Sequence, residues 1–162
     1  MSVTTHMNNG FVKYTHPTYN EIQMACRHIA EFIHYNDSGI GKVDNIVGIT
    51  RGGLMPAVEL SHLMNIPMET VNYSSKDGAG DDKNHANELP NVKGNSILLV
   101  DDICDSGHTL KELKEIYEGR GYNVFTAVIY YKTQTKPVFN PDVWAVNISQ
   151  NFGWIIFPHE TQ

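Results

Sequence analysis

The chain has 162 residues, 41% of them hydrophobic, and a formal net charge of -6. This length suits one domain with a substantial core. Because nucleic acids and anionic membranes are usually bound by a basic surface, the negative charge argues against both as generic partners. A phosphorylated ligand remains compatible with it, provided that local N–H groups, a few placed cations or a metal hold that ligand.

The sequence also indicates the cellular compartment of the protein and argues against one class of metal site. No basic region followed by an apolar one opens the chain, and no aliphatic run is long enough to span a bilayer. The two cysteines, Cys26 and Cys104, form no C-x-x-C motif, and none of the eight histidines belongs to an H-E-x-x-H motif. We therefore expect a cytoplasmic protein with free thiols and without a transition-metal site.

The start of the chain is polar and has no hydrophobic period. We expect residues 1–11 to be flexible and residues 12–162 to form a single domain. The first predicted element is a helix from Thr18 to about His34, because apolar residues recur there at helical spacing after Pro17 and a capping threonine.

A buried strand over residues 45–49 and a helix that begins near Leu54 are predicted next. Between them lies the sequence T-R-G-G, residues 50–53. Paired glycines allow a backbone to approach an anion closely, and the Arg51 guanidinium offers five fixed donors. An ordinary tight turn between a strand and a helix is the alternative explanation of this segment.

A second strand is predicted over residues 66–73, and a long polar stretch without period follows over residues 74–91. In a compact domain such a stretch is usually a functional lid or a disordered loop, and we favour a lid. Its acidic residues do not have the spacing of a calcium-binding loop.

The densest group of polar residues follows the third predicted strand, residues 97–100, in the segment D-D-I-C-D-S-G-H-T over residues 101–109. We expect the strand to end at Asp101 and a helix to begin near Thr109. Small and hydroxyl residues at a helix N-terminus leave N–H groups free for a phosphate. Paired carboxylates suit sugar hydroxyls or Mg²⁺, and Asp105 is available for proton transfer. The alternative is an acidic helix N-cap, with Asp105 or Ser106 as the capping residue.

Two further strands are predicted over residues 124–130 and 143–148, and Lys132 follows the first of them. Near the C-terminus, Trp154 and Phe157 lie where a planar ligand could stack, although aromatic residues near a chain end are more often core. Strands that alternate with helices, and polar loops after successive strands, predict an α/β fold. We expect an open, mostly parallel sheet of about five strands, with helices on both faces and ligands at the carboxyl ends of the strands.

The series of motifs resembles that of the type I phosphoribosyltransferases, and most of all the bacterial xanthine-guanine enzymes. The D-D-x-x-D-S-G-x-T pattern is similar to the family's motif for phosphoribosyl pyrophosphate (PRPP). K-Y-T at Lys13, G-I-T-R-G-G-L, V-x-Y-S-S, the lysine after the fourth strand and W-I-x-x-P-x-E at the tail occur in the family's order. The likeness covers residues 12–160 and implies the type I fold, with a small hood formed by the chain ends.

The resemblance implies a Mg²⁺-dependent transfer of the phosphoribosyl group from PRPP to N9 of a 6-oxopurine, namely xanthine, guanine or hypoxanthine. Pyrophosphate would be released, in purine salvage. Asp105 would be catalytic and manage the purine proton at N7. Asp101 and Asp102 would bind the ribose hydroxyls directly or through Mg²⁺, and Glu160 would help to hold a second Mg²⁺.

The resemblance also implies the residues that bind each substrate. For PRPP these are Thr50, Arg51 and Gly52 at the pyrophosphate, and Ser106, Gly107, His108 and Thr109 at the 5′-phosphate. Lys132 would donate to O6 of the base, Trp154 would stack on the ring, and the backbone of Ile155 would meet the C2 substituent. In this family the bond before the arginine position is often cis, and relatives assemble as dimers or tetramers, so we expect a homo-oligomer.

Three positions depart from the family pattern. Lys76 follows Ser75 where the family lid often has tyrosine, Ile156 takes a position that is acidic in the bacterial xanthine-guanine enzymes, and His159 replaces an aromatic residue. The preferred purine therefore stays open. Two other functions also stay open, a regulator that keeps the PRPP-binding fold and an enzyme of this fold for another base. The presence of Asp105, Lys132 and Trp154, without a basic face, favours the purine enzyme.

Overall fold

The computed structural model describes residues 14–35, 39–73, 89–133, 137–148 and 153–160. In chain order, its elements are β1 (Tyr14–Thr15), α1 (Tyr19–Tyr35), β2 (Asn45–Thr50), α2 (Leu54–Met64), β3 (Met68–Asn72), β4 (Ser96–Cys104), α3 (His108–Gly119), β5 (Asn123–Lys132), β6 (Val143–Ile148) and β7 (Trp154–Ile155). The predicted flexible start and the predicted lid around Lys76 lie outside the described residues.

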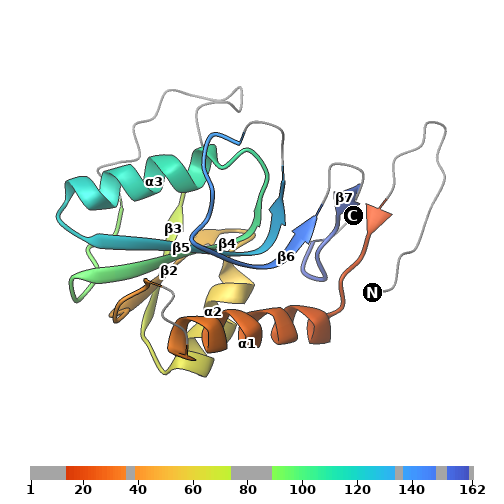
Figure 1. Cartoon of the computed structure of the whole chain (residues 1–162), viewed down its shortest axis with the longest axis horizontal. Coiled ribbons are helices and arrows are strands. Elements are labelled where there is room, and N and C mark those ends of the chain that lie inside the picture. Colours follow the sequence, from red (N-terminus) through yellow and green to blue (C-terminus); the bar gives the residue numbers. More distant parts are fainter. Residues whose placement is uncertain (1–13, 36–38, 74–88, 134–136, 149–152, 161–162) are drawn as a thin grey trace.

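Five of the strands form a parallel sheet in the order β3-β2-β4-β5-β6 (Figure 1). The two remaining strands, β1 and β7, come from opposite ends of the chain and pair in a small second sheet. The predicted α/β fold with an open parallel sheet is therefore confirmed, as is the small hood built from the chain ends.

Helices cover both faces of the larger sheet, with α1 and α2 on one face and α3 on the other (Figure 1). One apolar cluster joins Ile29 of α1 and Leu60 of α2 to Leu98 of β4, and a second joins Leu113 of α3 to Leu99 of β4. Because successive side chains of a strand point to opposite faces, the apolar run of β4 supplies both cores. None of the helices in the described ranges is long and apolar enough to cross a bilayer.

Helix α1 begins at the predicted cap. The Thr18 hydroxyl oxygen accepts a hydrogen bond from the backbone N–H of Glu21 at 3.2 Å, and the Glu21 carboxylate accepts one from the backbone N–H of Thr18 at 2.8 Å. This reciprocal pair is a capping box, which satisfies two N–H groups that the helix itself cannot bond. It fixes the start of α1 directly after β1.

Strand β4 is longer than predicted. The expected end at Asp101 is wrong, because β4 runs to Cys104 and stays in register with β5 as far as Tyr131. Its pairing with β2, in contrast, ends at Val100. Beyond Val100 the strand has a paired neighbour on one side only, so Asp101 and Asp102 lie in a strand whose other edge faces the loop after β2.

The split between β2 and β4 is also where the strand order changes direction. The chain goes from β2 to β3 on one side of the split, and from β4 to β5 and β6 on the other. The helices that follow the two strands, α2 and α3, lie on opposite faces of the sheet (Figure 1). Open α/β sheets bind ligands at such a point, outside the carboxyl ends of the strands.

The connection between β5 and β6 is held by Asp142. Its Oδ2 accepts hydrogen bonds from the backbone N–H and the hydroxyl of Thr126, each at 2.8 Å, and from Nζ of Lys114 at 3.3 Å. Thr126 is fully buried. In the same connection, the backbone N–H of Val138 donates to the carbonyl of Ser106 at 3.3 Å. The connection therefore also supports the loop that follows β4.

Replacing Asp142 with alanine should lower stability, because the buried N–H and hydroxyl of Thr126 would both lose their acceptor. Each such group costs about 1–3 kcal/mol, so the two cost about 2–6 kcal/mol together. Thermal unfolding followed by circular dichroism would measure the loss. Asp142→Asn keeps one acceptor oxygen and should lose clearly less, and Glu115→Ala at an exposed position should stay within about 0.5 kcal/mol of the parent. An alanine variant as stable as the parent would contradict this account of Asp142.

Candidate active site

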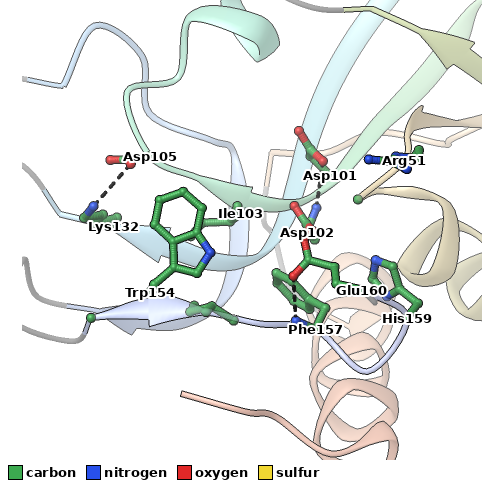
Figure 2. A pocket seen from close by; sticks show the side chains of 13 residues that line it. Arg51, Asp101, Asp102, Ile103, Asp105, Lys132, Trp154, Phe157, His159 and Glu160 are labelled. Atoms are coloured by element: carbon green, nitrogen blue, oxygen red, sulfur yellow. Dashed lines mark hydrogen bonds and ion pairs between the residues drawn. The ribbon is translucent and has the colours of Figure 1, made fainter. Parts of the chain in front are cut away.

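A cavity of about 510 Å³ lies at the carboxyl ends of β2, β4 and β5, beside β7 (Figure 2). Its lining includes residues from the loop after β2, from β4 and the loop after it, from the end of β5, and from the tail. These residues are Arg51, Gly52, Asp101, Asp102, Ile103, Asp105, Lys132, Gly153, Trp154, Ile155, Phe157, His159 and Glu160. Among the predicted site residues, only Thr50 and residues 106–109 lie outside this lining.

A second cavity, of about 140 Å³, adjoins the first and shares Asp101, Ile103 and Asp105 with it. All four predicted phosphate-binding residues, at positions 106–109, line this smaller cavity. Helix α3 begins at His108, so the N–H groups of its first turn lie at the same place. The structure therefore brings the predicted site residues, apart from Thr50, into two adjoining cavities.

The alternative reading of the acidic segment, an N-cap made by Asp105 or Ser106, is met in part and does not exclude a phosphate site. Gly107 is the N-cap residue of α3, with a φ of 85°. The hydroxyl oxygen of Ser106, one residue earlier, accepts a hydrogen bond from the backbone N–H of His108 at 3.5 Å. A Cβ at Gly107 would come within 2.8 Å of Phe139. Both the positive φ and this close approach require glycine at the start of α3, where the N–H groups of the first turn have no partner within the helix itself.

The two aspartates of β4 are held in a poorly solvated place. Asp102 is only 8% exposed, and its carboxylate lies against Gly52, where a Cβ would come within 2.4 Å of Oδ2. Burial raises the pKa of Asp102 to about 6. Burial, together with the charge of Asp102, also raises the pKa of Asp101. A cation bound nearby would favour the charged form of both groups.

Asp105 and Lys132 form an ion pair at the other side of the large cavity, with 3.2 Å between Oδ2 and Nζ. Lys132 is the last residue of β5, rather than lying beyond the strand as predicted. The Trp154 indole, which is 67% exposed, lies beside this pair (Figure 2). A hydrogen-bond donor, an acceptor and an aromatic face are thus available together.

The other tail residues have different surroundings. Phe157 is 3% exposed and packs on Tyr130 with 5.9 Å between ring centroids, so it belongs to the core. Ile155 is paired with Thr15, whose carbonyl accepts from the N–H of Ile156 at 3.0 Å. In a parallel pair this arrangement leaves the amide and carbonyl of Ile155 itself unused by β1. Those two groups therefore face away from β1.

Thr50 is the one predicted site residue that lines neither cavity. Its hydroxyl donates to the carbonyl of Val71 at 3.1 Å and so ties β2 to β3. The peptide bond between Thr50 and Arg51 is cis, as the resemblance implied. The next two residues, Arg51 and Gly52, do line the large cavity.

Three lining residues were missed by the sequence analysis, namely Ile103, Gly153 and His159, whereas Phe157 was considered there as a stacking surface. Ile103 was missed because β4 was expected to end at Asp101, two residues before it. With the observed length of β4, the alternation of strand side chains would have placed it beside Asp101. His159 was noted only as a departure from the family pattern.

The acidic lining fits Mg²⁺ bound together with a substrate. In the described parts of the chain, no set of three or more His, Cys, Asp or Glu side chains is arranged to hold a metal alone. Glu160 is, however, near enough to Asp102 for its charge to raise the pKa of that carboxyl. Buried carboxylates with room for further oxygen ligands are typical of sites where Mg²⁺ also binds substrate oxygens and water.

The comparisons with known proteins agree with this geometry. The phosphoribosyl transferase domain family model matches residues 18–161. A xanthine-guanine phosphoribosyltransferase from Ruegeria sp. is 30% identical over 157 residues, which cover 88% of this chain and 83% of the relative. A hypoxanthine-guanine phosphoribosyltransferase from Lactococcus lactis is 35% identical over 119 residues, which cover 69% of this chain and 65% of the relative.

Among solved structures, a purine phosphoribosyltransferase from Pyrococcus horikoshii matches with a TM-score of 0.69 and 27% identity, over 92% of this chain and 95% of the other. The region that the family model matches, residues 18–161, contains both cavities and the whole larger sheet. With its sheet order, its two adjoining cavities and a family match over nearly the entire sequence, the chain belongs to the type I phosphoribosyltransferase family.

Proposed function

We propose that this protein transfers the 5-phosphoribosyl group of PRPP to N9 of a 6-oxopurine and releases pyrophosphate, as a step of purine salvage. The observation that carries the proposal is the Asp105–Lys132 pair beside the exposed indole of Trp154. Together they offer a donor, an acceptor and a stacking surface to one flat base. The relatives named above, whose names specify xanthine-guanine and hypoxanthine-guanine enzymes, support this class of base.

The ammonium group of Lys132 selects the substituent at C6. It can only donate hydrogen bonds, so it suits the 6-oxo group of guanine, hypoxanthine or xanthine and opposes the 6-amino group of adenine. The backbone amide and carbonyl of Ile155 would meet the C2 substituent. Because a backbone offers both a donor and an acceptor, the proposal includes all three 6-oxopurines.

PRPP would extend from the large cavity into the small one. The N–H groups at the start of α3 and the hydroxyls of Ser106 and Thr109 would hold the 5′-phosphate, with Gly107 and His108 completing the loop. Asp101, which borders both cavities, would meet the ribose hydroxyls. Arg51 and the backbone at Gly52 would hold the pyrophosphate. Thr50 would contribute through its backbone only, because its hydroxyl is bonded to Val71.

The chemistry follows from where charge develops. As the bond between the anomeric carbon and pyrophosphate breaks, negative charge grows on the leaving group, and Arg51 with the loop N–H groups stabilises it. Positive charge grows on the ribose, N9 attacks the anomeric carbon, and Asp105 accepts the proton that the base releases from N7. Mg²⁺ held by Asp101, Asp102 and Glu160 would supply additional neutralisation of the leaving group.

We further propose that the protein acts in the cytoplasm as a homo-oligomer, a dimer or tetramer, as the resemblance implies. Both cysteines of the sequence, Cys26 and Cys104, are buried free thiols, which is common in a reducing compartment. Burial raises the pKa of each thiol to about 12, which favours packing roles over chemical ones.

A panel of bases tests the proposed function. The full chain is incubated with PRPP, Mg²⁺ and each of guanine, hypoxanthine, xanthine, adenine, uracil and orotate, and nucleotide is measured by chromatography. We expect nucleotide from one or more of the first three bases. Nucleotide only from another base would support the alternative enzyme, and none from any base would support the regulator.

Replacing Asp105 with asparagine should lower turnover by about a hundredfold or more, because an amide cannot accept the purine proton. PRPP affinity should change little, since the loop N–H groups remain. Steady-state kinetics and equilibrium binding would measure the two effects. Glu115→Gln removes an exposed carboxylate of α3 and provides the control. A turnover equal to that of the parent would remove Asp105 from its proposed role.

Replacing Trp154 with alanine should raise KM for the base by roughly tenfold, because stacking on an aromatic side chain is worth about 1–3 kcal/mol per base. Trp154→Phe should recover most of the affinity. Trp144 is a matched control, since it is the second tryptophan and packs on Tyr131 of β5, outside the cavity lining. If Trp144→Ala and Trp154→Ala had the same KM for the base, stacking at Trp154 would be refuted.

The buried carboxyl of Asp102 should make the ligand-free protein less stable at neutral pH than at about pH 4. Its pKa is about 6 in the folded protein against 3.8 for the ordinary group, so the folded state holds the proton over a range in which the unfolded state has lost it. Stability therefore falls as the pH rises from about 4 to about 6. Asp102→Asn carries no charge and should be more stable than the parent at pH 7 by about 1–3 kcal/mol, with a difference that shrinks toward pH 4.

Urea unfolding at several pH values would measure this effect. Asp44→Asn is the opposite control, because the backbone N–H of Asn95 and then Lys42 lower the pKa of Asp44. That substitution should reduce stability at pH 7 and less so in acid. An Asp102→Asn variant less stable than the parent at pH 7 would contradict the account of the buried carboxylate.

A further inference from the structure

His159 lines the large cavity, and the proposed reaction described above gives it no task. Its ring stacks on Phe157 with 5.6 Å between centroids and 28° between planes, and Phe157 packs in turn on Tyr130. Nδ1 of His159 is buried and has no hydrogen-bond partner among the described residues. A buried aromatic support therefore holds an imidazole whose hydrogen-bonding capacity is not used by the described protein groups.

The position of His159 assigns it to one half of the cavity. Both His159 and Glu160 are near enough to Asp102 to influence the pKa of its carboxyl, in opposite directions, and Asp102 lies against Gly52. The other half contains the Asp105–Lys132 pair and the Trp154 indole. Figure 2 shows His159 on the far side of Glu160 from Trp154. His159 thus lies with the loop after β2 and away from the place proposed for the base.

Among the described residues, that half of the cavity has few side-chain donors for an anion. The part of its lining that the structure describes includes the carboxylates of Asp102 and Glu160 and one guanidinium, that of Arg51. A diphosphate has many acceptor oxygens and binds best to several N–H donors. The imidazole is a better partner for these oxygens than for Mg²⁺, because Mg²⁺ prefers oxygen ligands.

The burial of Nδ1 also indicates which ring nitrogen can meet a ligand. Nδ1 has no exposed surface and no partner among the described residues, so it does not face a molecule in the cavity. His159 itself lines the cavity, which leaves Nε2 as the nitrogen that meets a ligand there. A ring nitrogen that carries a proton donates a hydrogen bond, so Nε2–H is the donor that His159 can offer.

We propose that Nε2–H of His159 donates a hydrogen bond to the pyrophosphate group of PRPP and, with Arg51, binds the leaving group. This inference rests on the proposed function, because it assigns His159 to the pyrophosphate end of the same cavity. It predicts a contribution to the affinity for PRPP and for free pyrophosphate, and none to the affinity for the base.

Three variants of the full chain test which ring nitrogen of His159 contributes to binding pyrophosphate. His159→Phe keeps a flat ring on Phe157 but has no nitrogen, His159→Asn places an amide group near the position of Nδ1, and His159→Gln places one near Nε2. Binding of inorganic pyrophosphate with Mg²⁺ is measured by calorimetry, without a base and without turnover. Kd should rise about tenfold for the Phe and Asn variants, the loss of one hydrogen bond to a charged group, and less than about threefold for Gln.

KM for guanine should stay within about twofold of the parent value in all three variants, as expected when an interaction is made with the other substrate. His28→Phe, at an exposed histidine of α1, controls for a general loss of histidine. Thermal unfolding checks that each variant folds. Pyrophosphate affinity unchanged in the Phe variant, or equally weak in the Gln and Phe variants while both fold, would overturn the inference.

The two proposals fail in different ways. If the parent protein makes no nucleotide from any base while its pyrophosphate affinity still depends on His159, the transferase proposal fails and this inference stands. If the parent makes nucleotide and the Phe variant binds pyrophosphate as the parent does, this inference alone fails.

Discussion

The contact between the Asp102 carboxylate and the backbone of Gly52 determines how the site is built. It lies where β2 and β4 stop pairing, and a Cβ at position 52 would come within 2.4 Å of a carboxylate oxygen. Only glycine allows the loop after β2 to come this close to β4. The contact brings Arg51 to the acidic end of β4, and it buries a carboxylate whose raised pKa a bound cation would lower.

The cavity has two chemically different halves on either side of Asp101. One half has the Asp105–Lys132 pair and an exposed indole, which suit a flat base with one oxo group. The other has Arg51, the Asp102 carboxylate and His159, which suit a diphosphate and its metal. The proposed transfer between N9 and pyrophosphate needs this separation, because the attacking group approaches the anomeric carbon from one side and the leaving group departs from the other. In that proposal the α3 N-terminus would hold the third part of the substrate, the 5′-phosphate.

The sequence predicted the elements that have local signals and missed what depends on distant contacts. The capping box and apolar stripes of α1 and α2 are local, and so is the loop before α3. The true length of β4 was missed, because Asp101 and Asp102 end the apolar run while pairing with β5 continues. The pairing of β1 with β7 joins residues far apart in the chain and was not predicted; the family resemblance implied only a small hood formed by the chain ends. The surroundings of His159 depend on Phe157 and Asp102 together, which no local pattern shows.

A crystal structure with guanosine 5′-monophosphate tests the central claim most directly, because the nucleotide has both the base and the 5′-phosphate. The account predicts guanine on the Trp154 indole with O6 within hydrogen-bonding distance of Lys132, and the phosphate against residues 106–109 at the start of α3. A nucleotide bound in the reverse orientation, with its base in the small cavity, would contradict it. So would a large cavity filled by the protein's own side chains while the nucleotide binds elsewhere.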